Sequence, residues 1–336
     1  MKRYLWGFVL AAMLAVMAAC GAKDDAPEAS GSGAAASPSA TASASASSPA
    51  ASPEGKETQY PITVQDATGQ SFTFDKAPER IVSTSPAETE MLFALGLNDQ
   101  VVGVSDYDNY PEEATTKTKV GGVTKPNEEA IVGLTPDLVI TGISMKEDVV
   151  AKFRDLKLNV YKTDAKTLDD VMNGILQIGV ITNRQAQAEA VVASMKADVQ
   201  KVKDAVGGLK QEEKKKVYVE FSPGWTVGKG EFMDEIITLA GGENVAGDTE
   251  GWNQINEETI VQRNPDVILF TQGVKDDQSG KTLEELIRGR SGWDKIQAIK
   301  DNRIVGLDQD LLSRPGPRLT QGLLAVAKAV YPDLVK

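Results

Sequence analysis

The residues best suited to chemistry in this chain are aromatic and polar side chains in segments predicted to be loops. They are Tyr107, Phe221, Trp225, Trp252, Asp310 and Arg314. Aromatic rings offer broad, rigid contact area, and a few polar groups fix the orientation of a bound molecule. The pattern is typical of a small-molecule site, with packing within a domain an equal alternative for most of them. Trp252 is the strongest candidate because Gly251 precedes it in an Asn-rich stretch.

The composition excludes several kinds of catalytic and metal site. The 336 residues include no histidine and one cysteine. A Ser-His-Asp triad, a Cys-His dyad, His-ligated metals, an internal disulfide and a cysteine-ligated cluster are therefore impossible. The stretch 228–230 (Gly-Lys-Gly) is too short for a phosphate-binding loop. The 36 basic and 48 acidic residues argue against nucleic-acid binding. We expect no cofactor, no metal site and no catalytic residue.

The N-terminus has the pattern of a bacterial secretory signal. Lys2 and Arg3 precede an apolar run from Tyr4 to Ala18, which is short for a transmembrane helix. The lone cysteine, Cys20, follows two alanines, an arrangement that resembles the lipobox of bacterial lipoproteins. This resemblance implies a signal peptide over residues 1–19 and a lipid-modified (palmitate-bearing) Cys20. The protein would then be anchored to the cell membrane through lipid only, facing outside the cytoplasm.

Residues 20–58 are predicted to be a tether. Within it, residues 29–53 are only Ala, Ser, Pro, Gly and Thr. Such a segment cannot bury enough apolar surface to offset its chain entropy. As a flexible spacer it would span roughly 25–30 Å. The folded body is expected to begin at residue 59, with a hairpin-like pair around residues 62–64 and 71–74.

The elements that must position the candidate residues come in two related halves. Residues 127–140 and 256–269 are identical at seven of fourteen positions without a gap. In both, an Asn suited to N-capping precedes two Glu in the first turn of a predicted helix, and Pro-Asp separates that helix from a β-branched strand. Residues 90–96 and 235–241 also match in pattern, and a strand and a Ser-Pro dipeptide precede each.

This repeat predicts an α/β fold with two Rossmann-like lobes, each built on a parallel-rich sheet. We assign residues 59–166 to the N-terminal lobe and residues 207–336 to the C-terminal lobe. The ligand cleft should lie between the lobes, at the carboxyl ends of the strands. Residues 167–206 join the lobes, and residues 183–206 are predicted to form a single long helix that restricts hinge closure.

Five stretches in this order resemble the ferric-siderophore and cobalamin binding family of ABC-importer substrate-binding lipoproteins. They are residues 78–82, 85–96, 134–139, 240–244 and 314–318, the last reading Arg-Pro-Gly-Pro-Arg. The resemblance implies a monomer that captures a metal chelate, either a ferric siderophore or a cobalamin-type corrinoid, and delivers it to the permease dimer of an ABC importer. It also places Ser85, Phe221, Trp252, Asp310 and Arg314 around the cleft.

The resemblance implies, in addition, that one acidic residue on each lobe docks onto the permease. The matching positions are Glu90 and Glu235, with Asp234 as an alternative to Glu235. Their equivalence under the internal repeat suits a two-fold symmetric partner.

The choice between the two ligands stays open at this stage. Asp310 and Trp252 resemble residues of cobalamin binders, but Val123 and Gly142 stand where such proteins often carry further tryptophans. Catecholate siderophore binders use several basic cleft residues, and here Lys125, Lys229 and Arg314 are available.

Two other functions remain to be weighed. One is a secreted carboxylate-dependent hydrolase such as a glycosidase, for which Asp108 and Asp310 would be the acid pair. The other is a metal-ion binding protein of the same architecture, which is disfavoured because such proteins rely on histidine ligands.

Overall fold

The computed structural model describes residues 56–335. The predicted signal, Cys20 and nearly all of the predicted tether lie outside these residues. The hairpin predicted at the start of the body is confirmed as β1 (Ile62–Gln65) and β2 (Ser71–Phe74), which pair antiparallel. Gly69 in their turn has φ 78°, a conformation that glycine adopts without strain.

The N-terminal lobe contains a five-stranded parallel sheet in the order β5-β4-β3-β6-β7. Its strands are β3 (Ile81–Ser83), β4 (Val101–Val104), β5 (Thr118–Lys119), β6 (Leu138–Thr141) and β7 (Val160–Lys162). Its helices are α1 (Pro86–Ala94), α2 (Glu128–Gly133) and α3 (Glu147–Asp155). The three central strands are wholly buried or nearly so, as expected for a parallel sheet covered on both faces.

The C-terminal lobe contains a four-stranded parallel sheet in the order β10-β8-β12-β13 and a small antiparallel pair, β11-β9. The strands are β8 (Lys216–Glu220), β9 (Trp225–Val227), β10 (Glu243–Asn244), β11 (Trp252–Gln254), β12 (Val267–Thr271) and β13 (Ile304–Leu307). The helices are α6 (Phe232–Leu239), α7 (Glu257–Arg263), α8 (Leu283–Gly289), α9 (Gln297–Lys300), α10 (Gln309–Ser313) and α11 (Leu319–Val330).

The internal repeat is visible in the topology, because β4-β3-β6-β7 and β10-β8-β12-β13 follow the same order of strands. The two predicted N-caps are confirmed. The Asn127 side chain accepts a hydrogen bond from the Ala130 backbone amide at 3.1 Å, and the Asn256 side chain accepts one from the Thr259 backbone amide at 3.0 Å. The repeated Pro-Asp has a further use, since Asp266 accepts a 2.8 Å bond from the backbone amide that begins β8.

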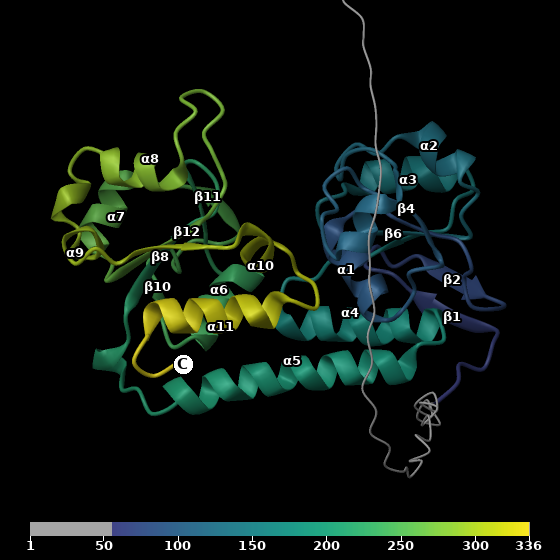
Figure 1. Ribbon diagram of the computed structural model, residues 1–336, viewed down its shortest axis with the longest axis horizontal. Coiled ribbons are helices and arrows are strands. Elements are labelled where there is room, and N and C mark those ends of the chain that lie inside the picture. Colours follow the sequence, from purple (N-terminus) through teal and green to yellow (C-terminus); the bar gives the residue numbers. More distant parts are fainter. Residues whose placement is uncertain (1–55, 336) are drawn as a thin grey trace, which may run out of the picture. The chain divides into compact units, whose positions relative to one another are not determined.

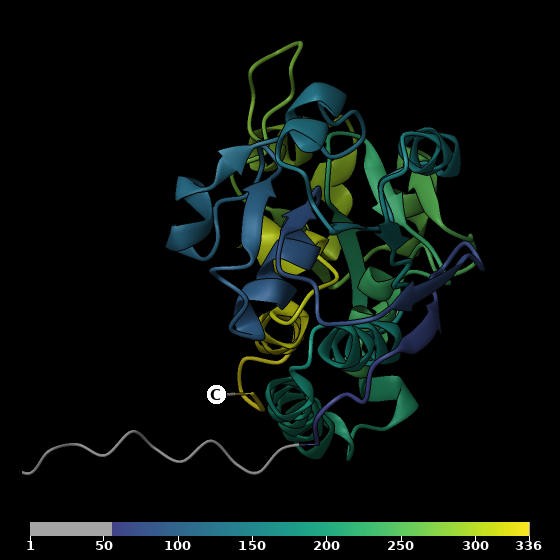
Figure 2. The ribbon, with the colours of Figure 1, turned by 90° about the vertical axis from the view of Figure 1, so that its right-hand side faces the viewer.

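The segment between the lobes consists of two helices, α4 (Leu168–Ile181) and α5 (Gln185–Val206), which lie side by side (Figures 1 and 2). They are separated at Asn183, which has φ 55°. Gly179 lets them approach closely, because a Cβ at this position would lie 2.6 Å from that of Ala188. The predicted long helix is confirmed as α5, which packs against α1 of one lobe and against α6 and α11 of the other.

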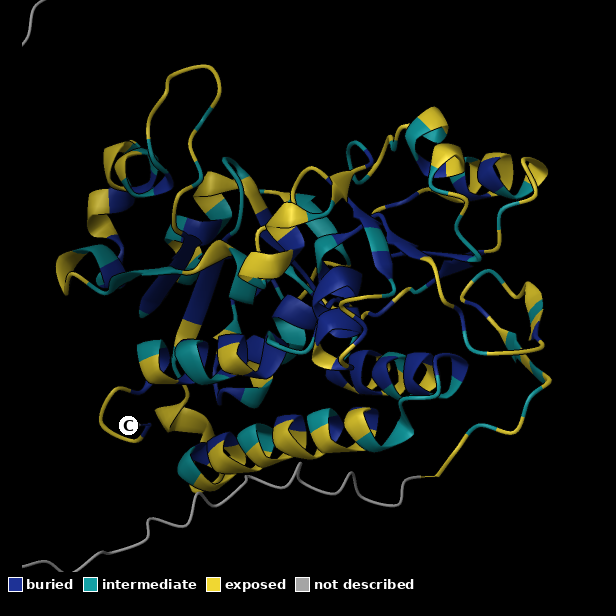
Figure 3. Cartoon of the chain, turned by 45° about the vertical axis from the view of Figure 1, so that its right-hand side comes forward, coloured by how far each residue is buried: buried dark blue, intermediate teal, exposed yellow. Residues whose placement is uncertain are grey.

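The hydrophobic core is shared between the lobes. One face of each sheet packs onto a common cluster that includes residues of α1, α4, α5, α6 and α11. Separate clusters fill the other face of each sheet. Burial follows this arrangement, with buried strands at the centre and the exposed face of α5 at the edge (Figure 3). Among residues 56–335, no helix has the length and apolar character needed to span a bilayer.

Candidate functional site

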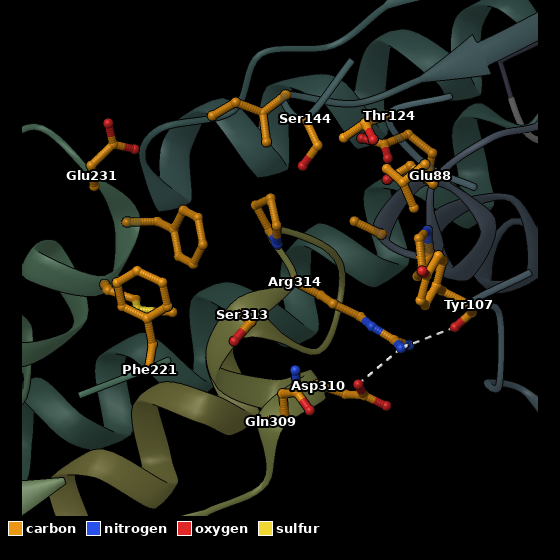
Figure 4. Close-up of a pocket in the computed structure, with 18 of the residues that line it drawn as sticks. Glu88, Tyr107, Thr124, Ser144, Phe221, Glu231, Gln309, Asp310, Ser313 and Arg314 are labelled. Carbon is orange, nitrogen blue, oxygen red and sulfur yellow. Dashed lines mark hydrogen bonds and ion pairs between the residues drawn. The ribbon is translucent and has the colours of Figure 1, made fainter. Parts of the chain in front are cut away.

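A cavity of about 1030 Å³ lies between the two lobes, lined by loops that follow their strands. Six of the seven predicted ligand contacts line it, namely Ser85, Tyr107, Phe221, Trp252, Asp310 and Arg314. Figure 4 labels four of them, Tyr107, Phe221, Asp310 and Arg314. The first two come from the N-terminal lobe and the other four from the C-terminal lobe. The strand ends of both halves therefore contribute to one site, as parallel sheets facing each other should.

Trp225 has a different location from the other six. It stands on β9, opposite Gln254 of β11, and is 38% exposed. It does not belong to the residues that line the cavity.

The C-terminal side of the cavity carries a cluster of aromatic rings. Phe221 and Trp252 meet edge to face with centroids 4.9 Å apart, and Phe232 approaches Trp252 at 5.7 Å. Rings held in this arrangement are rigid and keep their contact surface fixed. Across the cavity, Tyr107 is 65% exposed, so its ring is accessible to a ligand.

The arginine of the cavity, Arg314, is already neutralised by carboxylates from both lobes. Its guanidinium pairs with Asp310 at 2.8 Å and with Glu90 of the N-terminal lobe at 2.9 Å, and it donates to Asn109 at 2.8 Å. Figure 4 shows its guanidinium between Asp310 and Tyr107, with an interaction to each. Arg314 thus links the lobes and carries no uncompensated charge toward a ligand.

Glu90, which the sequence predicts to dock onto a partner protein, is buried within the fold. Glu90 is only 3% exposed. Its two carboxylate oxygens accept hydrogen bonds from Arg318 at 2.6 and 2.8 Å, and the carboxylate also pairs with Arg314. Arg318 also lies 3.8 Å above the Tyr110 ring. We name Glu90, Arg314 and Arg318 the inter-lobe ion cluster, because the acid and the bases come from different lobes.

Glu235 is partly buried and accepts a hydrogen bond from the first residue of α4. Its Oε2 accepts from the Leu168 amide at 2.7 Å, and burial raises the pKa of the carboxyl. The alternative, Asp234, accepts a 2.8 Å bond from the Asn244 side chain. Both carboxylates are engaged within the fold rather than held free for a partner.

The cavity also contains residues that sequence reasoning missed. Among them are the charged or polar residues Glu88, Thr124, Ser144, Lys166, Glu231 and Gln309. Glu88 and Glu231 are buried, and burial raises the pKa of both carboxyls. Glu88 stands two residues before Glu90 in α1, so the helix itself was predicted but its inward-facing acid was not singled out.

The acid pair suggested for a hydrolase has other partners. Asp108 is buried and accepts a 2.5 Å bond from Ser105, while Asp310 pairs with Arg314 and accepts from Asn109. Within residues 56–335, no cluster of three or more acidic, histidine or cysteine side chains could hold a metal ion. The two acids suggested for that reaction are thus each engaged within the fold.

Comparison with known proteins agrees with this arrangement. Residues 81–311 match the model of the family described as periplasmic binding protein. An ABC transporter substrate-binding lipoprotein of Bacillus subtilis, YvrC, is 37% identical over 84% of this chain and 89% of its own length. A cobalamin-binding protein of Halobacterium salinarum is 32% identical over 81% of this chain and 74% of its own.

A solved structure extends the likeness to three dimensions. The crystal structure of a possible iron-binding, periplasmic solute-binding protein from Staphylococcus epidermidis superposes with a TM-score of 0.65 and 31% identity. The match covers 76% of this chain and all of that one. The two-lobed α/β fold is therefore confirmed, and none of these matches supports a secreted hydrolase.

Proposed function

We propose that this chain, which belongs to the periplasmic binding protein family, captures a metal chelate for an ABC importer. The chelate that we propose is a cobalamin-type corrinoid. The proposal concerns the ligand, the residues that hold it, and the surface that meets the permease. The first support is the cobalamin-binding protein at 32% identity.

The size and lining of the cavity fit a large, amphipathic ligand. Its volume of about 1030 Å³ lies at the upper end for small-molecule sites, which are commonly about 300–1,000 Å³. The aromatic cluster of Phe221, Phe232 and Trp252 offers an apolar wall to a macrocycle, and Ser85 and Tyr107 add polar groups on the other side.

The observation that carries the choice is the charge of the cavity. Arg314 is compensated by Glu90 and Asp310, and the cavity also contains Asp164 and Glu231 beside Lys125 and Lys166. A multiply anionic ferric catecholate would need uncompensated basic groups to replace its hydration. An amide-rich corrinoid without a large net charge does not need them.

Ligand titration tests this proposal. We expect cyanocobalamin to quench the tryptophan fluorescence of the purified protein at micromolar concentration or below, because Trp252 lies at the cavity wall. A ferric catecholate should bind at least tenfold more weakly, a difference of about 1.4 kcal/mol. Tighter binding of the catecholate than of cyanocobalamin would contradict the proposal.

The internal repeat points to a different pair of carboxylates for the permease. In each lobe the helix that follows the repeated Asn begins with two glutamates. The first of these is paired with a base, Glu128 with Lys152 and Glu257 with Arg290. The second, Glu129 in α2 and Glu258 in α7, is exposed and has no ion-pair partner among the described residues.

We infer that Glu129 and Glu258 meet basic groups on the two halves of a two-fold permease. Replacing both with Ala should abolish ligand-dependent stimulation of the reconstituted importer without changing ligand affinity. The matched control replaces two exposed acids elsewhere, Glu113 and Glu212, and should transport normally. Loss of affinity in the Glu129 and Glu258 variant, or unchanged transport, would refute the assignment.

We propose that Cys20 carries the lipid that holds the protein at the membrane, with residues 20–58 as its spacer. The lipoprotein name of the Bacillus subtilis relative supports this view. Replacement of Cys20 with Ser should release the protein from the membrane fraction, whereas the wild type should stay with it after a high-salt wash. A membrane-bound Cys20→Ser variant would contradict the proposal.

A further inference from the structure

The two lobes differ in the connection that leads from the repeated strand to the helix after it. In the N-terminal lobe, residues 142–146 join β6 to α3, and Ile143 and Ser144 among them line the cavity. In the C-terminal lobe, residues 272–282 join β12 to α8, and none of them lines the cavity. The second connection has eleven residues against five in the first, and we name it the C-lobe hairpin.

The C-lobe hairpin is held in shape by its own hydrogen bonds. Lys275 and Thr282 form an antiparallel bridge, and the Asp276 amide donates to the Lys281 carbonyl at 2.8 Å. Near the tip, the Ser279 amide donates to the Asp276 carboxylate at 2.7 Å. Thr282 is also the N-cap of α8, which ties the hairpin to the start of that helix. The tip is therefore presented from a defined base.

The C-lobe hairpin projects from the body of the protein. Eight of its eleven residues are exposed, while Val274 at its base packs against a hydrophobic cluster of the C-terminal lobe. Figures 1 and 2 show the hairpin rising beyond the rest of the chain, on the side of the molecule that carries α2, α7 and α8 and away from α4 and α5. Loops that extend from a rigid scaffold in this way are common places for contact with a partner.

The exposed charges of the hairpin are not used within the fold. Lys275, Asp277 and Lys281 are exposed, and none of them has an ion-pair partner among residues 56–335. Hydrogen bonds from Thr282 and, to a smaller extent, the two lysines lower the pKa of Glu285 in α8, but no ion pair joins the lysines to it. The hairpin thus offers both cationic and anionic groups to a polar protein surface.

We propose that the C-lobe hairpin is a further contact with the permease, made by the C-terminal lobe alone. The inference rests on the proposed function and deepens it, because α2 and α7, which carry Glu129 and Glu258, lie on the same side of the molecule (Figure 1). Those two acids are related by the internal repeat and suit equivalent groups of a two-fold permease. The hairpin has no counterpart in the N-terminal lobe, so one half of the permease receives this contact and the other does not.

The charges of the hairpin specify the surface that it fits. The permease half that meets it should present an acidic group toward Lys275 and Lys281 and a basic group toward Asp277. Contacts of this kind at the edge of an interface act mainly on the rate of association and weaken as the salt concentration rises.

The test measures binding to the cognate permease–ATPase complex in nanodiscs, in the absence of ligand. The parent chain runs from residue 20 to residue 336 with Cys20→Ser, so that no lipid contributes to binding. The hairpin variant adds Lys275→Ser, Asp277→Ser and Lys281→Ser to this chain. It keeps Asp276 and the backbone hydrogen bonds that hold the hairpin.

The matched control changes the same residue types at another exposed place in the same lobe. It carries Asp294→Ser, Lys295→Ser and Lys300→Ser, three residues without an ion pair in the described part of the chain. These residues precede β13, so they lie near the amino ends of the strands, whereas the cavity lies at the carboxyl ends.

We expect the hairpin variant to bind the complex roughly tenfold more weakly than the parent, and the control to stay within about twofold of it. The difference should shrink at about 0.5 M salt. Cyanocobalamin affinity, measured by tryptophan fluorescence, should be the same in all three chains, because the hairpin does not line the cavity. Thermal melting checks that each chain is folded.

A second readout tests for contact directly. Gln278→Cys places a single thiol at the exposed tip of the hairpin in the parent chain, to which a photo-cross-linker is attached. It should join the chain to one permease subunit per complex, whereas the same label at Lys295→Cys should not. Absence of a cross-link from the hairpin tip would overturn the proposal.

The outcomes separate the hairpin from the proposed function. If the parent chain does not bind the complex, the importer role fails and the role of the hairpin fails with it. If the parent and the hairpin variant bind equally well, the importer role stands and the hairpin contact is overturned. Weaker cyanocobalamin binding by the hairpin variant would make the hairpin a part of the ligand site, which also overturns the proposal.

Discussion

Removal of the Glu90 carboxylate is the perturbation that the structure makes most informative. Glu90 is the acid of the inter-lobe ion cluster, and its substitution leaves Arg314 and Arg318 facing each other near the buried surface of α1. Breaking a buried pair from one side costs about 3–5 kcal/mol, because the remaining charge has lost its partner in a poorly solvated place. Asp310 still pairs with Arg314, so we expect the lower part of this range for Glu90→Gln.

The measurement is the free energy of unfolding from urea denaturation at neutral pH. The matched control is Glu79→Gln, because Glu79 forms an ion pair with Lys76 in which both side chains are more than two-thirds exposed. Exposed pairs contribute about 0–1 kcal/mol, so the control should stay within that range. Combining Glu90→Gln with Arg318→Met should restore part of the loss, since one unpaired cation is then removed. A loss for Glu90→Gln no larger than that of the control would refute the reasoning.

Three further predictions concern other parts of the fold. Burial raises the pKa of Asp66, but its hydrogen bonds and Arg154 lower that pKa by more, so the net pKa is below its usual value. The stabilisation that Asp66 contributes is therefore complete above its pKa in the unfolded state and is lost as the pH falls through its pKa in the folded state. Asp66→Asn should lower the melting temperature at neutral pH, and the gap from wild type should shrink in acid. Gly228→Ala should cost about 1–3 kcal/mol in urea denaturation, because its Cβ would lie 2.3 Å from a backbone oxygen, whereas Gly208→Ala has open space and should cost less than about 1 kcal/mol. Trp252→Leu should weaken cyanocobalamin binding about tenfold in isothermal titration, since one aromatic contact is worth roughly 1 kcal/mol or more; unchanged affinity would place the ligand elsewhere.

Much of the fold could be predicted because its signals are local or repeated. The Asn-Glu-Glu and Pro-Asp patterns of residues 127–140 and 256–269 identified both capped helices and the strands after them. The helix from residue 183 to 206 was visible from its continuous helical composition, and only its first residues differ from α5. These features depend on backbone capping and periodicity, which neighbouring residues determine.

The roles of individual charges could not be predicted in the same way. Glu90 was expected at the surface because the family resemblance and the internal repeat assigned it to docking onto the permease. Its burial results from Arg314 and Arg318, more than 220 residues away, which tertiary packing brings onto it. Glu88 was overlooked for a related reason, since its burial and its hydrogen bond with Thr163 arise from tertiary packing.

The most direct test of the account is a competition between ligand classes for the purified protein. Cyanocobalamin and a ferric catecholate should be titrated separately and then against each other, with tryptophan fluorescence and isothermal titration as readouts. We predict a single site for cyanocobalamin with at least tenfold preference over the ferric catecholate, consistent with a cavity whose arginine is already paired. A preference for the catecholate, or binding that persists unchanged when Trp252 is replaced, would contradict it.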